Sequence, residues 1–354
     1  MFREFSIDFF AKMCYNSSKG SEIVTYKKLA GLIGVSPSTV SKALSGSPEI
    51  SRETADYIRR EAERFGVVRP NYRREHSSKR VAVIVPEVIS VYYSTAATSM
   101  IEELRGRGYE ASIYICGFTE SRAFELLDLI ESEKLADAVV LLTSIRNMQK
   151  RKLPIVTICD SKGGENCDSV CVDLRGGVLS VIEHLISLGH RRIGFIGERN
   201  TSIKLDYFLD ACKKCGIEVS RKDIFVSSKR FEMIGVEGAD YFLKMRSRPT
   251  AYLTVYDEVA FGAMHTFSAH GISVPCDVSI VGINDIPSSA FAQTPLTTLR
   301  TFSDEMMRIA VGLLIDKLEH PGERPFQSVK LRCELIIRGT TGALGSGGGE
   351  VRRI

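Results

Sequence analysis

The chain has 354 residues, of which 44% are hydrophobic and 25% are charged. This composition is typical of globular proteins large enough for more than one domain. No apolar run reaches the length that spans a bilayer, and the first residues lack the pattern of a signal peptide. The nine cysteines are scattered without regular spacing, which favours a reducing compartment. We therefore expect a cytoplasmic protein with no membrane partner.

The net charge of +4 is distributed unevenly along the chain. Residues 1–80 contain fifteen Lys and Arg against nine Asp and Glu, whereas the remainder is close to neutral. A basic amino-terminal segment on a nearly neutral body indicates contact with a polyanion, although a solvated charged surface would have the same composition. Charge alone does not distinguish these two interpretations.

Three helix signals follow one another within residues 24–69. Apolar residues at helical spacing predict a first helix in "YKKLAGLI", with Thr25 as its cap and Gly34 at its end. Ser36 and Pro37 are the cap and the first residue expected of a second helix. A third amphipathic helix is predicted in "RETADYIRREAERFG". Two short helices at a tight turn, supported by a third, predict a helix-turn-helix domain.

The second helix of such a domain can enter the major groove of DNA with its first residues at the base edges. Its outward side chains are expected to be Pro37, Ser38, Ser41 and Lys42. Lys42 can reach guanine acceptors, Ser38 can bond to donors or acceptors, and Pro37 can contact a thymine methyl. A three-helix unit used for protein contacts is the alternative, but spacing and charge together favour DNA.

The stretch "VTYKKLAGLIGVSPSTVSKALSGSPEISRET" resembles the headpiece of the lactose-repressor (LacI/GalR) family of transcription regulators. The resemblance continues to about Gly342 and implies that Pro37, Ser38 and Lys42 read operator bases. Thr25, Tyr26, Lys27 and Ser47 are predicted phosphate contacts. The full set of predicted DNA contacts is Thr25, Tyr26, Lys27, Ser36, Pro37, Ser38, Thr39, Ser41, Lys42, Ser47, Asn71, Arg73 and Arg74.

The predicted linker, residues 70–80, departs from the family pattern. The family's "PN" dipeptide is present as Pro70 and Asn71, but Ser77 occupies the place of the leucine that wedges into the minor groove in the family. Because separating stacked bases costs a few kcal/mol, the wedge must be apolar. Arg73 and Arg74 can still bind phosphates. The hypothesis is that this protein holds its operator without the family's central kink, or kinks it less than wedge-bearing relatives do.

From Val81 onward, apolar strand-like runs alternate with amphipathic helix-like stretches. This alternation predicts parallel sheets covered on both faces, and the number of strands favours two lobes. Segments such as "VIEHLISLGHRRIGFIG" and "RPTAYLTVYDEVAFGAM" resemble the periplasmic-binding-protein-like sensor of the same family. The expected fold is an all-α helix-turn-helix headpiece followed by a two-lobed α/β sensor with two doubly wound parallel sheets.

The expected fold also predicts the boundaries of the domains and lobes. The sensor core spans 81–340, and the resemblance implies that the chain crosses between lobes near 160–173, 297–303 and 320–325. Lobe 1 is expected to contain about 81–165 and 300–320, and lobe 2 about 166–299 and 321–340. Residues 1–23 form an extension of unexplained role, and the glycine-rich residues 341–354 are predicted to be a flexible tail.

Ligands of such sensors bind at the carboxyl ends of the strands, where loops from both lobes converge. Asp257 follows the strand "AYLTVY", so it can either accept hydrogen bonds from a ligand or cap the next helix. Lys204 stands where many family sensors have an arginine. Because lysine is a point charge, a bidentate contact with the effector would be lost there. Asp173 can alternatively anchor a crossing between the lobes. Tyr92 and Tyr93 are candidates for stacking on a ligand, and they can alternatively be packing residues. The predicted effector contacts are Tyr92, Tyr93, Asp173, Arg199, Thr201, Lys204, Phe231 and Asp257.

The predicted function is a DNA-binding transcriptional regulator, a repressor controlled by a small-molecule effector such as a sugar. Its expected partners are double-stranded DNA with a pseudo-palindromic site, the effector, and a second copy of the chain. The helix at "DEMMRIAVGLLIDKLE" resembles the family helix that helps to pair the sensors. No cofactor or metal is expected, and no catalytic motif was found. The alternative is a solute-binding or metabolic α/β protein that does not regulate transcription.

Overall fold

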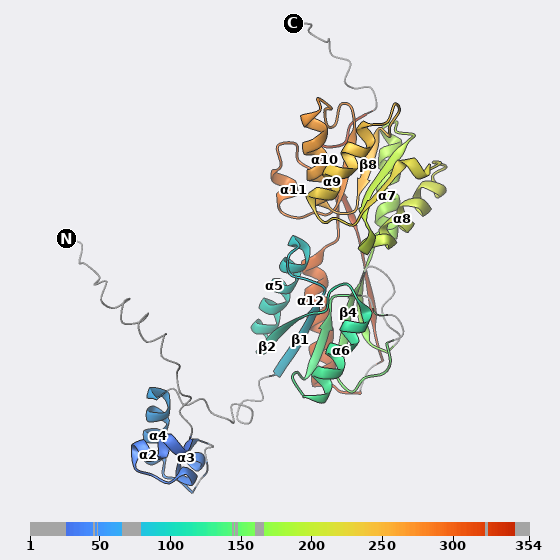
Figure 1. The fold of residues 1–354 in the computed structure, drawn as a ribbon. Coiled ribbons are helices and arrows are strands. Elements are labelled where there is room, and N and C mark those ends of the chain that lie inside the picture. Colours follow the sequence, from blue (N-terminus) through green and yellow to red (C-terminus); the bar gives the residue numbers. More distant parts are fainter. Residues whose placement is uncertain are drawn as a thin grey trace, which may run out of the picture. The chain divides into compact units, whose positions relative to one another are not determined.

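The computed structural model describes residues 26–44, 47, 49–65, 79–143, 145, 148–159, 166–322 and 325–343. The chain divides into two compact units, 1–77 and 78–354. Figure 1 shows the three short helices of the first unit and the two sheets of the second, each of which is covered by helices. We call the first unit the headpiece and the second the body.

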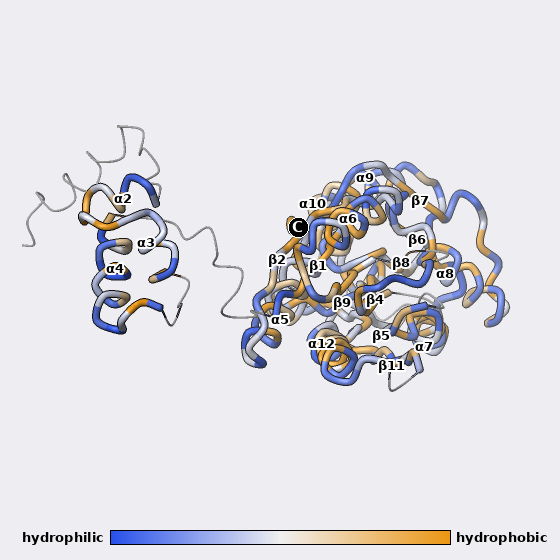
Figure 2. The backbone as a smooth tube through the Cα atoms, turned by 90° about the horizontal axis from the view of Figure 1, so that it is seen from below, coloured by the Kyte–Doolittle hydropathy of each residue, from blue (hydrophilic) through white to orange (hydrophobic). Residues whose placement is uncertain are grey.

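The headpiece consists of α2 (Tyr26–Ile33), α3 (Pro37–Leu44) and α4 (Arg52–Arg64). Gly34 ends α2 with a φ of +71°, a conformation that glycine adopts without steric cost. The side chains of Leu29, Val40, Ala43 and Ile58 are fully buried and form the centre of a small core. Figure 2 shows apolar and polar stretches alternating along these helices, as amphipathic helices require. The predicted helix-turn-helix arrangement is confirmed.

The first sheet of the body contains six parallel strands in the order β11-β5-β4-β3-β1-β2. Helices α5, α6 and α12 belong to this lobe, which we call lobe 1, and α12 contacts both α5 and the sheet. The bounds are β1 Lys79–Val85, α5 Val91–Gly106, β2 Tyr109–Ile115, α6 Glu120–Ser132, β3 Ala138–Leu141, β4 Ile155–Cys159, β5 Asp168–Asp173, α12 Ser303–Glu319 and β11 Ser328–Arg332.

The second sheet has the order β12-β10-β9-β8-β6-β7, and only β12 runs antiparallel to its neighbour. We call this part lobe 2. Its bounds are α7 Leu174–Ser187, β6 Ile193–Glu198, η1 Arg199–Thr201, α8 Ser202–Lys214, η2 Arg221–Asp223, β7 Ile224–Ser227, α9 Glu232–Leu243, β8 Ala251–Thr254, α10 Asp257–Ala269, β9 Ser279–Asn284, α11 Ser288–Phe291, β10 Thr297–Arg300 and β12 Glu334–Ile336. Among the described helices, none has both the length and the apolar character needed to cross a membrane.

The strand pairing corrects two of the predicted lobe boundaries. Residues 168–173 were expected in lobe 2, but they form β5, which pairs with β4 and β11 in the sheet of lobe 1. Residues 328–332, also expected in lobe 2, form β11 in that same sheet. The chain therefore passes between the lobes directly after β5, between β10 and α12, and at Cys333 between β11 and β12. Apolar runs in the sequence do not reveal which sheet each strand joins.

Helices α9 and α10 make the closest helix contact in lobe 2, and glycines permit it. A Cβ atom added at Gly235 would lie 2.0 Å from the carbonyl oxygen of Val259, and one added at Gly262 would lie 1.9 Å from the carbonyl oxygen of Glu232. Both obstacles are backbone atoms, which cannot move aside without shifting a helix. These two glycines therefore set the distance between α9 and α10, whose amino-terminal ends carry residues near the lobe interface.

Replacing Gly235 by Ala should lower the free energy of unfolding by about 1–3 kcal/mol, because the added methyl group would push the two helices apart. Urea unfolding monitored by circular dichroism measures this change. Gly106→Ala is the matched control, since nothing lies within 4 Å of a Cβ atom at that helical position. The control should leave stability unchanged or raise it slightly. Equal losses in both variants would contradict the close-approach argument.

Candidate nucleic-acid interface and effector region

The exposed face of α3 carries the small polar side chains that the sequence predicted. Pro37, Ser38 and Ser41 are exposed, whereas Val40 and Ala43 on the opposite face are fully buried. The Ser36 hydroxyl accepts a hydrogen bond of 3.0 Å from the Thr39 amide, which caps the helix. The Ser36 and Thr39 hydroxyls also lie 2.8 Å apart. The cap and the buried face fix α3 so that its first turn presents side chains to solvent.

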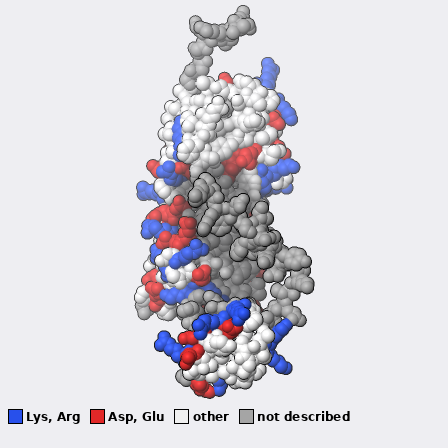
Figure 3. Space-filling model, turned by 90° about the vertical axis from the view of Figure 1, so that its left-hand side faces the viewer, with Lys and Arg blue, Asp and Glu red and all other residues white. Residues whose placement is uncertain are grey.

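Lys42 lies one turn farther along α3 and forms an ion pair with Glu49. The predicted partner of Lys42 is a guanine base, so Glu49 would have to release Lys42 when DNA binds. Such a pair is exposed and therefore weak, which makes the exchange easy. Figure 3 shows both positive and negative side chains on the visible face of the headpiece.

The other predicted DNA contacts are only partly described by the structure. Lys27 is exposed on α2, and Tyr26 and Ser47 are half-buried. The Ser47 hydroxyl accepts a hydrogen bond of 3.4 Å from the Glu49 amide. Thr25, Asn71, Arg73 and Arg74 lie outside the described residues, as does Ser77 at the predicted wedge position.

In the body, six side chains meet near the carboxyl ends of strands from both sheets, and we call them the interlobe cluster. Arg230, after β7 in lobe 2, forms two hydrogen bonds of 2.9 and 2.8 Å with the carboxylate of Glu87, which follows β1 in lobe 1. The Nε atom of Arg230 also lies 2.9 Å from Glu198, the last residue of β6. The cluster consists of Glu87, Phe118, Glu198, Arg230, Phe231 and Tyr256.

The rings of Phe118 and Phe231 and the hydroxyl of Tyr256 also belong to the surroundings of the Arg230 guanidinium. Its central carbon lies 4.9 Å from the ring centre of Phe118 and 4.7 Å from that of Phe231, distances at which a cation is attracted to a ring. The Tyr256 hydroxyl donates a hydrogen bond of 3.1 Å to Glu198 and accepts one of 3.0 Å from the Phe231 amide. Phe118 belongs to lobe 1, so both the ion pair and the ring contact join the lobes.

Burial dominates the electrostatics of the cluster. Burial raises the pKa of Glu198, and the charge of Arg230 and the Tyr256 hydrogen bond oppose that rise. Burial by itself would lower the pKa of Arg230, but the hydrogen bond to Glu87 and the charge of Glu198 outweigh it and raise the pKa. Burial also raises the pKa of Tyr256, which keeps its hydroxyl protonated as a donor. Arg230 therefore remains a cation and stabilises the charged form of its buried partner.

Three predicted aromatic residues lie at or beside this cluster. The rings of Tyr92 and Tyr93 contact each other edge to face with centres 5.1 Å apart, and Tyr93 lies 6.2 Å from Phe118. Phe231 belongs to the cluster and has a φ of +57°, a strained value for a residue with a side chain. Tyr93 and Phe231 are far apart in the sequence. In the structure Phe231 lies against the guanidinium of Arg230, and Tyr93 contacts Phe118, the other ring beside that guanidinium.

The polar side chains that were predicted to contact an effector lie in different surroundings. Lys204 is buried and donates a hydrogen bond of 3.1 Å to the Val255 carbonyl oxygen. Arg199 is exposed, and the Thr201 hydroxyl donates to the Glu198 carbonyl oxygen at 3.4 Å. Asp173 caps α7 and forms an ion pair of 2.8 Å with Lys330, and the Lys330 hydrogen bond lowers the pKa of its carboxyl. This geometry supports the anchoring alternative for Asp173.

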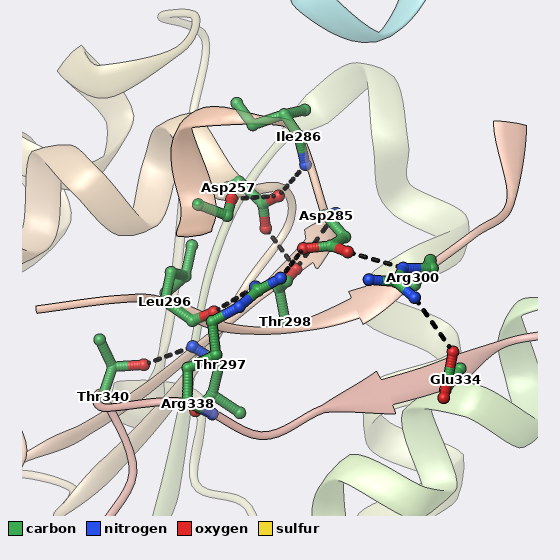
Figure 4. A network of polar contacts seen from close by, with 11 residues as sticks. Asp257, Asp285, Ile286, Leu296, Thr297, Thr298, Arg300, Glu334, Arg338 and Thr340 are labelled. Carbon is green, nitrogen blue, oxygen red and sulfur yellow. Dashed lines mark hydrogen bonds and ion pairs between the residues drawn. The ribbon is translucent and has the colours of Figure 1, made fainter. Parts of the chain in front are cut away.

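Asp257 is fully buried, and its carboxylate is occupied by protein donors (Figure 4). The Ile286 amide donates at 2.8 Å and the Ser289 hydroxyl at 2.9 Å, and the Thr298 hydroxyl donates to the other oxygen. A Cβ atom at Gly282 would lie 2.1 Å from Asp257, so glycine is required there. These contacts indicate that Asp257 fixes the loop after β9 instead of facing a ligand, which disfavours the predicted effector role.

A second carboxylate extends this network to the edge of the sheet. Asp285 forms ion pairs of 2.7 Å with both Arg300 and Arg338, and Arg300 also lies 3.3 Å from Glu334 on β12 (Figure 4). Asp285 and Asn284 have positive φ values of 54° and 113°. The network holds this unusual loop conformation beside the crossing into α12.

Sequence reasoning singled out Phe231 but missed its neighbour Arg230 and the partners Glu87, Glu198 and Tyr256. Each of them stands within three residues of a strand end, which is the signal that was used for Asp257. That signal is shared by many residues, and only the folded chain shows which of them meet.

Comparisons with known proteins agree with this architecture. A family model described as a periplasmic binding protein-like domain matches residues 182–341. The HTH-type transcriptional repressor CytR of Escherichia coli (strain K12) is 29% identical over 343 residues, which cover 93% of this chain and 99% of that protein. The lac repressor dimer bound to operator and an anti-inducer has a TM-score of 0.69 at 18% identity, covering 91% and 100% of the two chains. The CelR–cellobiose complex has a TM-score of 0.63 at 22% identity, covering 89% and 99%.

Replacing Asp257 by Asn should change how stability depends on pH. Burial raises the pKa of Asp257 to about 7 against the three hydrogen bonds, whereas an unfolded chain has a value of about 3.9. Between these values the folded state binds more protons, so the carboxyl makes the free energy of unfolding fall as pH rises. The Asn variant should show a shallower fall from about pH 4 to pH 7 in urea unfolding. An identical slope in both proteins would contradict this assignment.

Proposed function

The chain belongs to the lactose-repressor (LacI/GalR) family, and on that premise we propose that it is a transcriptional repressor controlled by a small-molecule effector. The observation that carries the proposal is the exposed polar first turn of α3, held by a cap and a buried opposite face, in a unit separate from the body. That geometry suits insertion into a major groove. A regulator of this kind acts in the cytoplasm, where its DNA lies.

Recognition of an operator would divide between two sets of side chains. Pro37, Ser38 and Lys42 would read base edges, and Lys27 and Tyr26 would position the headpiece on phosphates. Two headpieces related by a two-fold axis would read a pseudo-palindromic site, as expected for a homodimer. The dimeric lac repressor bound to its operator supports this assembly, and α12 is the proposed pairing helix.

Effector control would come from the two lobes of the body. The interlobe cluster lies where strand ends from both sheets meet, which is where ligands of open parallel sheets bind. A sugar or related metabolite is the proposed effector class, supported by the cellobiose complex of CelR. An effector that binds two arrangements of the lobes unequally shifts the balance between them, and with it the affinity for DNA. We place the protein among regulators and not among enzymes, as its relative CytR is a repressor.

Selection from random double-stranded DNA tests the proposal directly. The purified full chain should enrich a pseudo-palindromic sequence and bind it, in fluorescence anisotropy at moderate ionic strength, at least about 1,000-fold more tightly than random competitor. Equal affinity for selected and random DNA would remove the regulator proposal. A thermal-shift screen of sugars and nucleosides with the same protein then identifies the effector.

Lys42→Ala should weaken binding to the selected operator by about 1–3 kcal/mol and relax the preference at one base position. Lys27→Ala is the matched comparison, because a lost phosphate contact weakens binding to all sequences and lowers the salt slope by about one. Anisotropy titrations over a series of salt concentrations and single-base operator variants measure both effects. A uniform loss for Lys42→Ala would make it a phosphate contact instead.

Glu49→Gln should tighten binding to the same operator. Lys42 forms an ion pair with Glu49 in the headpiece without DNA, and the substitution removes this competing negative charge. A gain of a few tenths to about 1 kcal/mol is expected, the range of exposed ion pairs. In a Lys42→Ala background the same substitution should gain less. An equal gain in both backgrounds would show that Glu49 acts through general repulsion of DNA.

A further inference from the structure

We propose that Arg230 is a specificity-determining residue of the effector region and that Glu87 acts as its built-in ligand. In this proposal the carboxylate of Glu87 occupies the place that an effector takes, and it holds the two lobes together until the effector replaces it. The ligand group that fits is a pair of neighbouring oxygen acceptors, as on a carboxylate or on adjacent hydroxyls of a sugar. The effector part rests on the proposed function, whereas the contact between the lobes does not.

One side of the Arg230 guanidinium is anchored only by its own lobe. Within lobe 2, Glu198 lies 2.9 Å from the Nε atom and Phe231 stacks on the guanidinium. The side chain of Glu198 is 2% exposed and is held in turn by the Tyr256 hydroxyl. These contacts stay intact when the lobes separate, so the guanidinium keeps its position in lobe 2.

The remaining half of the guanidinium faces lobe 1. Both terminal nitrogens donate to Glu87, at 2.9 and 2.8 Å, in the paired geometry that arginine forms with a carboxylate. The guanidinium of Arg230 also lies over the ring of Phe118, which belongs to lobe 1. Separation of the lobes therefore breaks these two contacts and leaves a pair of donors pointing out of lobe 2.

The donors of Arg230 determine which group can replace Glu87. A planar pair of donors binds two adjacent oxygen atoms better than a single point charge does. Glu198 already supplies one negative charge to Arg230, so the replacing group can be neutral or anionic. Tyr93, whose ring contacts Phe118 edge to face, and Phe231 provide aromatic surface beside it. The chemistry on both sides of Arg230 thus selects a ring-bearing ligand with adjacent oxygens.

Hydrogen–deuterium exchange of the full chain without effector tests the contact between the lobes. Arg230→Ala and the more conservative Glu87→Gln should each speed exchange in residues 86–93 by roughly ten- to a hundredfold, since a hydrogen bond to a charged group contributes about 1.5–3 kcal/mol. Arg175→Ala is the matched control, because Arg175 pairs with Asp210 and stacks on Tyr207 within lobe 2. Unchanged exchange in Glu87→Gln, or equal acceleration in the control, would overturn the proposal.

Chemical rescue tests the ligand class with a defined probe. In Glu87→Ala, acetate at millimolar concentration should restore slow exchange in residues 228–234, which surround Arg230, because it returns two adjacent oxygens to that guanidinium. Chloride at the same ionic strength should not restore it, and Arg230→Ala should not respond to acetate. Acetate that is no better than chloride would overturn the assigned ligand chemistry. These outcomes do not involve DNA, so they are independent of the operator selection that tests the proposed function.

Discussion

The convergence of strand ends is the constraint on which the rest of the body depends. Parallel strands present their carboxyl ends at one side of a sheet, and three crossings of the chain join the two lobes. Residues at or just after the carboxyl ends of β1, β2, β6, β7 and β8 meet around one guanidinium. Two of them, Glu87 and Arg230, are 143 positions apart in the sequence. Each strand ends in a loop that needs polar groups, so this meeting place is polar.

A buried charge is tolerated only with partners, and the contacts of Asp257 and Asp285 meet that requirement. Asp257 receives three donors and thereby fixes the loop after β9, while Asp285 pairs with two arginines at the edge of the sheet. These contacts all lie within lobe 2. The Arg230 contacts instead extend to lobe 1, so the proposed replacement of Glu87 would leave the lobe 2 contacts in place.

The headpiece combines a small buried core with an exposed polar surface. Its core is small, and the buried side chains of α2, α3 and α4 leave the polar first turn of α3 in solvent. The ion pair between Lys42 and Glu49 satisfies the cation in the absence of DNA. Exposed pairs of this kind contribute little to stability. Under the proposed operator contact, exchanging Glu49 for a base would therefore cost little.

Local signals in the sequence were enough to predict the headpiece and the fold class of the body. Ser36, Pro37 and Gly34 define a tight turn between helices through hydrogen bonding and backbone geometry within a few residues, and the alternation of apolar strands and helices specifies parallel sheets. Only the folded chain reveals that β5 and β11 join lobe 1, that Asp257 is enclosed, and that Arg230 meets Glu87. Those outcomes depend on which strands pair and on contacts between residues far apart in the chain, and no local pattern of side chains encodes them.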